Sequence, residues 1–243
     1  MQTTQLNHTV THEMIAGLPA PVQRYMHYTG VVGQPWINTV HLKYTGQFRL
    51  GTDKPWMSLQ ADQVYRTDPP GFQWRARFKM FGLPLMSAQD TYSGGEAHMF
   101  GKLAGLFTVF DARDDELRQG AMVRYLQEIV WFPMAYLGQY VTWDAVDDHA
   151  ADVTLTHGNV SVTGRMYFDD AGRILSFIAD RYAEQNGSYT LETWSTPITE
   201  YATFAGLNLP CTGLGVWQYP EGDLTYINLR VTDIAYNVAI RDF

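Results

Sequence analysis

The sequence predicts a β-dominated α+β fold, in which a strongly curved antiparallel sheet, a half or open barrel, surrounds one long central helix. Three observations support this prediction. Apolar and polar side chains alternate with a period of two over most of the chain after Asn38. Only residues 111–138 show a long helical rhythm instead. Turn signals, with no break in composition, separate the alternating segments, which indicates a continuous meander in one domain.

Length and composition agree with this fold class. The chain has 243 residues, of which 46% are hydrophobic and 14% are aromatic. A chain of this length fits one large domain or two small ones. Aromatic residues favour strands and also line apolar cavities, so their abundance agrees with a sheet curved around a pocket.

Charge, cysteine content and hydropathy exclude several classes of protein. The net charge is -8 and the 17 Lys and Arg residues are scattered, so we expect no nucleic-acid partner, because such binding needs a basic face. The single cysteine, Cys211, excludes an intrachain disulfide. The N-terminus has neither the basic nor the apolar region of a secretory signal, and no stretch is long enough to span a membrane. We therefore expect a cytoplasmic protein without a transmembrane segment.

The N-terminal part is expected to combine a flexible segment with short helices. Residues 1–12 are polar and are predicted to be flexible, and residues 13–243 are predicted to form the single β-rich domain. One short helix is predicted to begin near His12 and a second to follow Pro21. Gly30 is the predicted C-cap of the second helix, because glycine readily adopts the left-handed backbone that ends many helices.

Strands are predicted wherever apolar residues occupy every second position. In residues 72–80, aromatic and aliphatic side chains at the even positions alternate with polar side chains at the odd ones. Similar patterns predict about ten to twelve strands along the chain. Residues 98–110 are ambiguous between strand and helix, but Gly101 and Gly105 favour strand.

The central helix is predicted over residues 111–138, where it plugs or caps the concave side of the sheet. Gly120 weakens its first turns by roughly 1 kcal/mol relative to alanine. Pro133 predicts a kink or a break in its last third. Arg124 and Glu128 are four residues apart, so they lie above one another on one face of the helix.

Familiar catalytic motifs are missing from the sequence. It contains no glycine-rich phosphate loop, no GxGxxG after a strand and no GxSxG elbow. His8 and His12 have the spacing of two metal ligands on a helix, but a third ligand is lacking nearby. We therefore predict no metal site and no cofactor.

Arg124 and Glu128 form the first candidate site. Their neighbours are apolar on almost every side, so burial is as consistent with the sequence as an exposed ion pair. A buried pair needs further hydrogen bonds. The charges on apolar strands that could supply them are Arg75, Arg77, Asp90 and Arg181. Three roles stay open: anchoring the helix to the sheet, binding a ligand carboxylate through Arg124, and acid–base catalysis by Glu128 with Tyr92 polarising the substrate.

Aromatic residues form the second candidate site. Most of them are expected in the core, and a subset is expected to line an apolar cavity with indole N–H and hydroxyl groups that orient a ligand. The predicted ligand-binding residues are Trp74, Arg77, Asp90, Trp131, Arg181, Trp194, Trp217 and Tyr226.

Five stretches carry a resemblance to a known family. They are GLPAPVQRYMHYTGVVG, GFQWRAR, VRYLQEIVWFP, TWDAVDDHAADV and GVWQYPEGDLTYINLRVTDIAYN. From Gly17 onward the chain resembles a bacterial family of uncharacterised proteins known only as a domain of unknown function, which implies no catalytic residues. FDDAGRILSF and ATFAGLNLP are similar to late strands of the LolA/LolB-like lipoprotein carriers. That second resemblance implies a half-barrel of antiparallel strands around helices.

Two functions follow as hypotheses. In the first, the cavity between sheet and central helix binds an apolar or amphipathic small molecule, such as a fatty acyl or polyketide-like compound. In the second, the protein is a cofactor-free cyclase, isomerase, lyase or hydrolase that acts on a hydrophobic substrate in the same cavity. Glu128 is then the acid or base, since a desolvated carboxylate can exchange protons at neutral pH.

Overall fold

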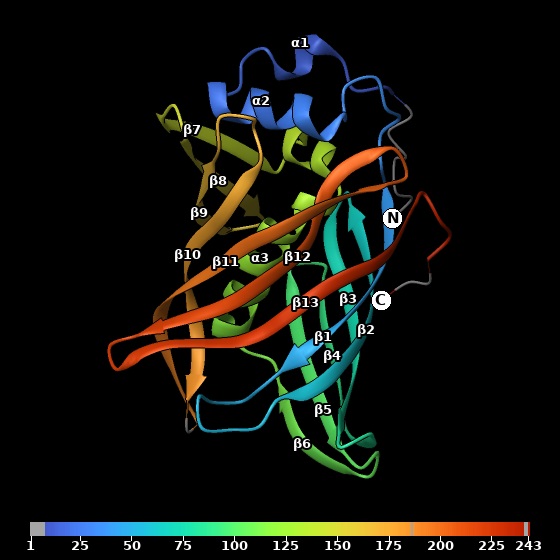
Figure 1. Ribbon diagram of the computed structural model, residues 1–243, viewed down its shortest axis with the longest axis vertical. Coiled ribbons are helices and arrows are strands. Elements are labelled where there is room, and N and C mark those ends of the chain that lie inside the picture. The colour runs from blue at the N-terminus through green and yellow to red at the C-terminus, as the bar shows by residue number, and fades with distance from the viewer. Residues whose placement is uncertain (1–7, 186, 241–242) are drawn as a thin grey trace.

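One antiparallel sheet of thirteen strands dominates the computed structural model, which describes residues 8–185, 187–240 and 243 (Figure 1). The strand order is β6-β5-β4-β3-β2-β1-β13-β12-β11-β10-β9-β8-β7. Neighbours in the sheet are thus neighbours in the chain, except where the first strand pairs with the last. The sheet stays open, with β6 and β7 at its edges, and the predicted fold class is confirmed.

The strands are long and their buried faces alternate as the sequence predicts. In β3, for example, the even positions from 72 to 78 are buried, and Arg75 and Arg77 are exposed. The strands are β1 (Thr39–Phe48), β2 (Met57–Thr67), β3 (Pro70–Met80), β4 (Leu83–Ser93), β5 (Glu96–Leu103), β6 (Phe107–Ala112), β7 (Val141–Asp147), β8 (Ala150–His157), β9 (Val160–Phe168), β10 (Ile174–Gln185), β11 (Ser188–Phe204), β12 (Leu207–Tyr219) and β13 (Gly222–Tyr236).

The ambiguous residues 98–110 are resolved as strand. They complete β5 and begin β6, and the turn between the two strands places Ala104 and Gly105 in the left-handed region. Glycine adopts that conformation without strain, which explains why the chain reverses at this position.

Two short helices lie at the N-terminal end, α1 (His12–Ile15) and α2 (Ala20–Thr29). Gly30 caps α2 with a φ of 74°, as predicted. Residues 1–7 of the predicted flexible segment lie outside the described residues. The rest of that segment contacts the fold, because residue Thr9 forms a β-bridge with Pro35 and Val10 is buried.

The long helix α3 (Asp115–Glu128) begins where its N-cap satisfies a free backbone N–H. The side chain of Asp114 accepts a hydrogen bond from the backbone nitrogen of Leu117 at 2.7 Å. The predicted start at residue 111 was too early, because Asp111 and Ala112 pair with β5 as the end of β6.

The C-terminal part of the predicted helix is broken. After α3, two 3-10 segments follow, η1 (Ile129–Trp131) and η2 (Pro133–Leu137). Phe132 separates them with a φ of -146°. A residue that precedes proline is sterically excluded from the helical region, so the helix cannot run through this point. The break makes the continuous helix shorter than the sequence predicts.

Helix α3 lies across the concave side of the sheet and packs against both of its flanks. It contacts β3, β4 and β5 on one flank and β8, β9 and β10 on the other (Figure 1). Residues 120–123 and 125–128 of the helix are buried, which is typical of a helix enclosed on several sides. This position brings Arg124 and Glu128 against the sheet. Among the described residues, no helix has the length and apolar character needed to cross a bilayer.

Candidate functional site

A cavity of about 940 Å³ lies between α3 and the concave face of the sheet. Both flanks contribute to it, with β1 to β6 on one side and β10 to β13 on the other. Its apolar wall includes Phe48, Phe78, Met86, Met99, Phe110 and Ile227. Cavities that hold small molecules in proteins generally measure about 300–1,000 Å³, so this one is at the large end of the range.

Arg124 is surrounded by acceptors at the wall of this cavity. Its Nε donates to Glu128 Oε1 at 2.8 Å, and its Nη1 donates to Asp90 Oδ2 at 2.9 Å. Its Nη2 donates to Gln63 Oε1 at 3.0 Å. Each of the three nitrogens of Arg124 therefore has an acceptor.

Glu128 completes the network from the other side. Its Oε2 accepts from Gln63 Nε2 at 2.8 Å and from the Tyr65 hydroxyl at 3.2 Å. Gln63 and Tyr65 both belong to β2, whereas Asp90 belongs to β4. The network thus joins α3 to two strands, which is the anchoring role among the three considered. It gives hydrogen-bond partners to both oxygens of Glu128, to the three nitrogens of Arg124 and to one oxygen of Asp90.

Burial sets the protonation of the network. It raises the pKa of the Asp90 carboxyl, although the guanidiniums of Arg124 and Arg181 act in the opposite direction. Burial alone would lower the pKa of Arg124, but the carboxylates of Glu128 and Asp90 outweigh it and raise that pKa. Burial and the neighbouring Glu128 raise the pKa of Tyr65, so its hydroxyl stays protonated and donates.

Arg181 of β10 faces the same cavity with far fewer partners. Its guanidinium lies 4.8 Å from the ring of Trp194 and 5.5 Å from the ring of Trp217. Its Nε donates to the backbone oxygen of Gly120 at 3.0 Å. A Cβ at position 120 would lie 3.4 Å from this Nε, so the glycine lets the arginine approach the helix closely. Within the described part of the chain, Arg181 has no carboxylate partner.

Three buried polar atoms of cavity-lining residues have no partner at normal hydrogen-bonding geometry. They are Trp74 Nε1, Asp90 Oδ1 and Thr196 Oγ1, which account for half of the six such side-chain atoms in the described residues. Burial raises the pKa of the Tyr44 hydroxyl, although the Trp74 indole is close enough to that hydroxyl to act against it. A buried polar group without a hydrogen bond costs about 1–3 kcal/mol, and folded proteins rarely tolerate it. All three atoms belong to residues that line the cavity, but neighbouring atoms cover them, so a ligand reaches them only where those neighbours move aside.

Nine of the eleven residues predicted at a site line this cavity. They are Trp74, Asp90, Arg124, Glu128, Trp131, Arg181, Trp194, Trp217 and Tyr226.

The other two predicted residues lie elsewhere. Arg77 is exposed on the outer face of the sheet, because the alternation along β3 turns it away from its inward-facing neighbours Ala76 and Phe78. Tyr92 lies two positions beyond Asp90 on β4, and its hydroxyl contacts His157 Nδ1 at 2.6 Å. Burial raises the pKa of Tyr92. It links β4 to β8 and does not contact Glu128, so the structure separates the predicted catalytic tyrosine from the predicted acid or base.

Gln63, Tyr65 and Thr196 are the important residues that the sequence analysis missed. Gln63 and Tyr65 fall on the apolar face of β2, in register with Leu59 and Ala61. The sequence could therefore have indicated Gln63 as a candidate site residue, because a glutamine at an inward-facing position of a strand needs a buried hydrogen-bond partner. Thr196 had no comparable signal, because residues 194–196 are buried consecutively and the alternation fails at that point.

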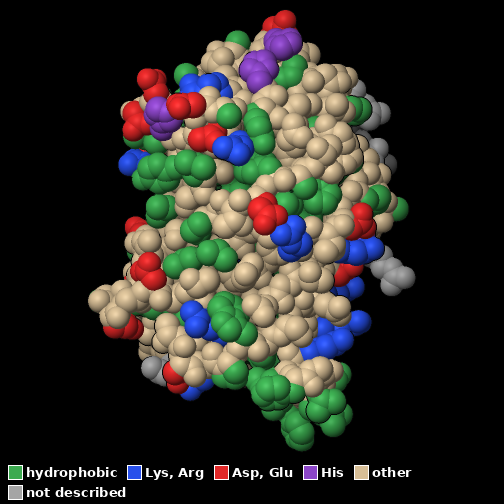
Figure 2. Space-filling model, viewed as in Figure 1, with side chains coloured by type: hydrophobic (Ala, Val, Ile, Leu, Met, Phe, Trp, Pro, Cys, Tyr) green, Lys and Arg blue, Asp and Glu red, His purple; other side chains and the backbone are tan. Residues whose placement is uncertain are grey.

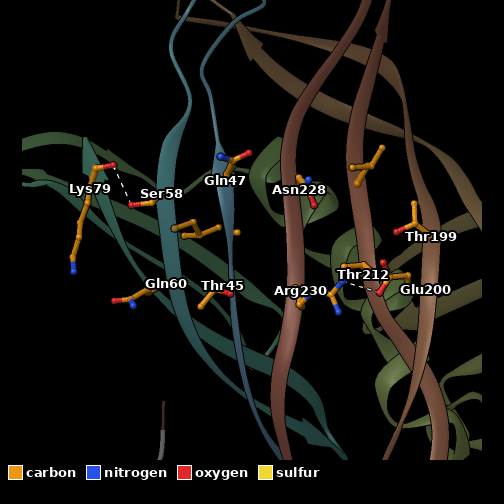
Figure 3. A pocket seen from close by; sticks show the side chains of 13 residues that line it. Thr45, Gln47, Ser58, Gln60, Lys79, Thr199, Glu200, Thr212, Asn228 and Arg230 are labelled. Carbon is orange, nitrogen blue, oxygen red and sulfur yellow. Dashed lines mark hydrogen bonds and ion pairs between the residues drawn. The ribbon is translucent and has the colours of Figure 1, made fainter. Parts of the chain in front are cut away.

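A second hollow, of about 630 Å³, lies on the outer face of the sheet (Figure 3). Polar side chains of β1, β2, β11 and β13 surround it, and Arg230 pairs with Glu200 there at 2.7 Å. These side chains are exposed and can be hydrated by solvent. The mostly apolar cavity between α3 and the sheet is therefore the stronger candidate site.

Comparisons with known proteins agree with the fold. A model of a family of unknown function, DUF6544, matches residues 8–229. No curated protein matches the chain. A DUF1329 family protein from Desulfovibrio piger ATCC 29098 is similar in structure, with a TM-score of 0.51, 11% identity, and coverage of 93% of this chain and 96% of that one. A LolA superfamily protein from Nitrosomonas europaea gives a TM-score of 0.49 and 8% identity, covering 92% and 96%. At such identity, the first match shows a shared fold alone.

Proposed function

The chain belongs to the DUF6544 family, whose function is unknown, and we propose from its cavity that it binds an amphipathic small molecule with an acidic end. One observation carries the proposal. In a large, mostly apolar cavity, Arg181 lines the wall and has no carboxylate partner among the described residues.

The apolar body of the ligand would occupy the space between the two flanks of the sheet. Aromatic, methionine and aliphatic side chains together make up most of the lining residues. Removing apolar surface from water stabilises a complex by roughly 25 cal/mol per Å², so a long hydrocarbon or a fused ring system would gain most from this cavity.

The acidic end would meet Arg181. Its guanidinium presents planar N–H groups that match a carboxylate, sulfate or phosphate. Arg124, which we expected in this role, is less suited because Glu128, Asp90 and Gln63 already accept from all three of its nitrogens.

Polar groups along the ligand would meet the three buried polar atoms where the neighbours that cover them move aside. The indole N–H of Trp74 can donate to a carbonyl or ether oxygen, and the hydroxyl of Thr196 can donate or accept. Asp90 Oδ1 can accept from a hydroxyl. These contacts would give orientation and selectivity in addition to the affinity of the apolar wall.

A fluorescent long-chain fatty acid and its methyl ester test the proposal directly. The wild type should bind the acid roughly tenfold or more tightly than the ester, because a hydrogen bond to a charged group contributes about 1.5–3 kcal/mol. Arg181→Met should remove this preference, and the matched outer-face variant Arg77→Met should keep it. If the wild type binds neither probe, the proposed function is wrong; if Arg181→Met keeps the preference, the acid lies elsewhere.

A second candidate function is cofactor-free catalysis in the same cavity. Both oxygens of Glu128 already accept hydrogen bonds, so the predicted acid–base role fits it poorly. Asp90 fits better, because burial raises its pKa and its Oδ1 has no partner among the described residues. Conversion of a bound acyl ester by the wild type, lost in Asp90→Asn and retained in Arg77→Met, would support this alternative. Recovery of every bound compound unchanged, by mass spectrometry, would count against it.

The expected cytoplasmic location stays a prediction. Fractionation of cells that express the tagged full-length protein would test it.

A further inference from the structure

Two hairpins form an exposed apolar tip at one end of the molecule. The turns between β3 and β4 and between β5 and β6 are neighbours, since Ala104 donates its backbone N–H to the backbone oxygen of Leu85 at 2.8 Å. Figure 2 shows hydrophobic side chains gathered at this lower end. The four side chains most exposed there are Phe81 at 94%, Leu106 at 79%, Leu83 at 72% and Phe107 at 67%.

Packing in the core does not explain why these four positions carry large apolar side chains. At such exposure they bury almost no surface against the core. Phe81 also has a φ of 51°, in the left-handed region that a bulky residue adopts only with strain. A contiguous apolar patch of this kind on a soluble domain usually marks a surface that contacts another molecule or a membrane.

The charge around the tip has one sign. Residues 71–89 and 97–110, which contain most of the two hairpins, include no aspartate or glutamate, although the whole chain has a net charge of -8. The charged residues in these ranges are Arg75, Arg77, Lys79 and Lys102. Basic side chains behind an apolar tip attract a surface of negative charge, and the long stems of lysine and arginine keep their charge at a water interface.

We propose that this tip docks onto a membrane surface that carries anionic lipid headgroups. Phe81, Leu83, Leu106 and Phe107 would enter the boundary between headgroups and acyl chains, and Lys79 and Lys102, beside the turns, would contact the phosphates. Arg75 and Arg77, further along β3, would add only to the longer-range attraction. Apolar insertion and electrostatic attraction are the two contributions by which peripheral proteins bind bilayers. Within the two hairpins, no acidic residue lies near the turns, because Asp90, Glu96 and Asp111 are in the parts of the strands away from the tip. A tip that is apolar and flanked only by basic residues of its hairpins fits a lipid surface of negative charge.

The tip is continuous with the cavity. Leu103 and Val109 are 39% and 48% exposed on the second hairpin, and both also line the cavity. Leu50, which is 70% exposed, lines it from the loop after β1. Docking would therefore bring the cavity entrance close to the lipid surface, where an amphipathic ligand could enter or leave without crossing water. This consequence rests on the proposed function, but the docking itself does not.

Vesicle co-sedimentation tests the inference. The full-length protein should sediment with vesicles that contain phosphatidylglycerol, and at least tenfold less with vesicles of phosphatidylcholine alone. The double variant Phe81→Ser/Leu106→Ser should lose most of this binding. Lys79→Glu/Lys102→Glu should also weaken it and should reduce its dependence on salt. The matched control Leu175→Ser/Leu191→Ser changes two leucines that are 47% and 52% exposed on β10 and β11, and it should bind as the wild type does.

Several outcomes would overturn the inference. Failure of the wild type to sediment with either vesicle contradicts it, and so does equal binding by the tip variants and the control. A self-association in analytical ultracentrifugation that disappears in the serine variant, without vesicle binding, would show that a second copy covers the tip. Circular dichroism of each variant establishes that it is folded. Binding of the fatty acid probe in solution should be retained by the tip variants, which separates a failure of docking from a failure of the proposed function.

Discussion

Arg124 of α3 and Arg181 of β10 face one cavity and are packed in similar ways. Arg124 lies 5.0 Å from the ring of Phe72 and 4.9 Å from that of Trp74, and Arg181 lies at similar distances from two tryptophans. The difference is in their acceptors. Arg124 meets two carboxylates and an amide, and Arg181 meets one backbone carbonyl.

This difference assigns the two arginines different roles. A guanidinium whose nitrogens are all engaged holds the surrounding elements together and has little capacity for a ligand. One that keeps N–H groups without acceptors at a cavity wall can bind an anion. Two arginines at the same cavity therefore have different proposed roles. Arg124 of α3 is structural, and Arg181 of β10 is the binding group.

The largest effect is expected from Arg124→Met. The substitution leaves Asp90 and Glu128 buried without their cation, and breaking a buried pair in this way costs about 3–5 kcal/mol. Unfolding in urea, followed by circular dichroism, measures the loss. Arg181→Met is the matched control and should cost less, about 1–3 kcal/mol, because it loses two ring contacts and one hydrogen bond to Gly120 but leaves no buried carboxylate without its cation. An equal decrease in the free energy of unfolding in the two variants would contradict the different roles of Arg124 and Arg181.

A smaller effect on binding is expected from Arg181→Lys. Lysine keeps the charge but lacks the planar fork, so the preference for the acid over the ester should fall by roughly threefold to tenfold. Probe titration measures it. A preference equal to that of the wild type would mean that charge alone, without the geometry of the guanidinium, selects the acid.

Tyr65→Phe tests how much a single hydrogen bond contributes to the network of Arg124 and Glu128. The variant removes one donor to Glu128 Oε2, which still accepts from Gln63, so a loss of about 1 kcal/mol is expected in the urea experiment. Tyr226→Phe, on the flank of Arg181, offers a control from the same cavity. A loss above about 3 kcal/mol would indicate that the network depends on the tyrosine far more than one hydrogen bond explains.

The smallest effect is expected at the hydrogen bond between Tyr92 of β4 and His157 of β8. Burial lowers the pKa of His157, so the unfolded chain binds the proton at a higher pH than the folded protein does. This contribution to stability is complete above the unfolded pKa of about 6.5 and is lost as the pH falls through the lowered value. Thermal unfolding at about pH 7 and about pH 5 should show a smaller decrease for His157→Gln than for the wild type. Parallel decreases would exclude this histidine as a cause.

Much of the site could be read from the sequence, for reasons that particular residues show. Arg124 and Glu128 stood out because their helix neighbours are apolar, and Asp90 because its strand is. Arg77 was predicted wrongly although the alternation of β3 contained the answer, since it shares its outward face with Arg75. Tyr92 could not be placed, because its partner His157 is 65 residues away.

Local periodicity determined the class of fold, the antiparallel hairpins and the inward face of most strands, because each depends on residues close together in the chain. The predicted single meander is instead two, β1 to β6 and β7 to β13, which the long-range pairing of β1 with β13 joins into one sheet. Only the tertiary structure decided which arginine is engaged. Arg124 finds its acceptors Gln63 and Asp90 at separations of 61 and 34 residues, and Arg181 finds Gly120 at 61. Hydrogen bonds at such separations follow from how the sheet curves around α3, and no local pattern encodes them.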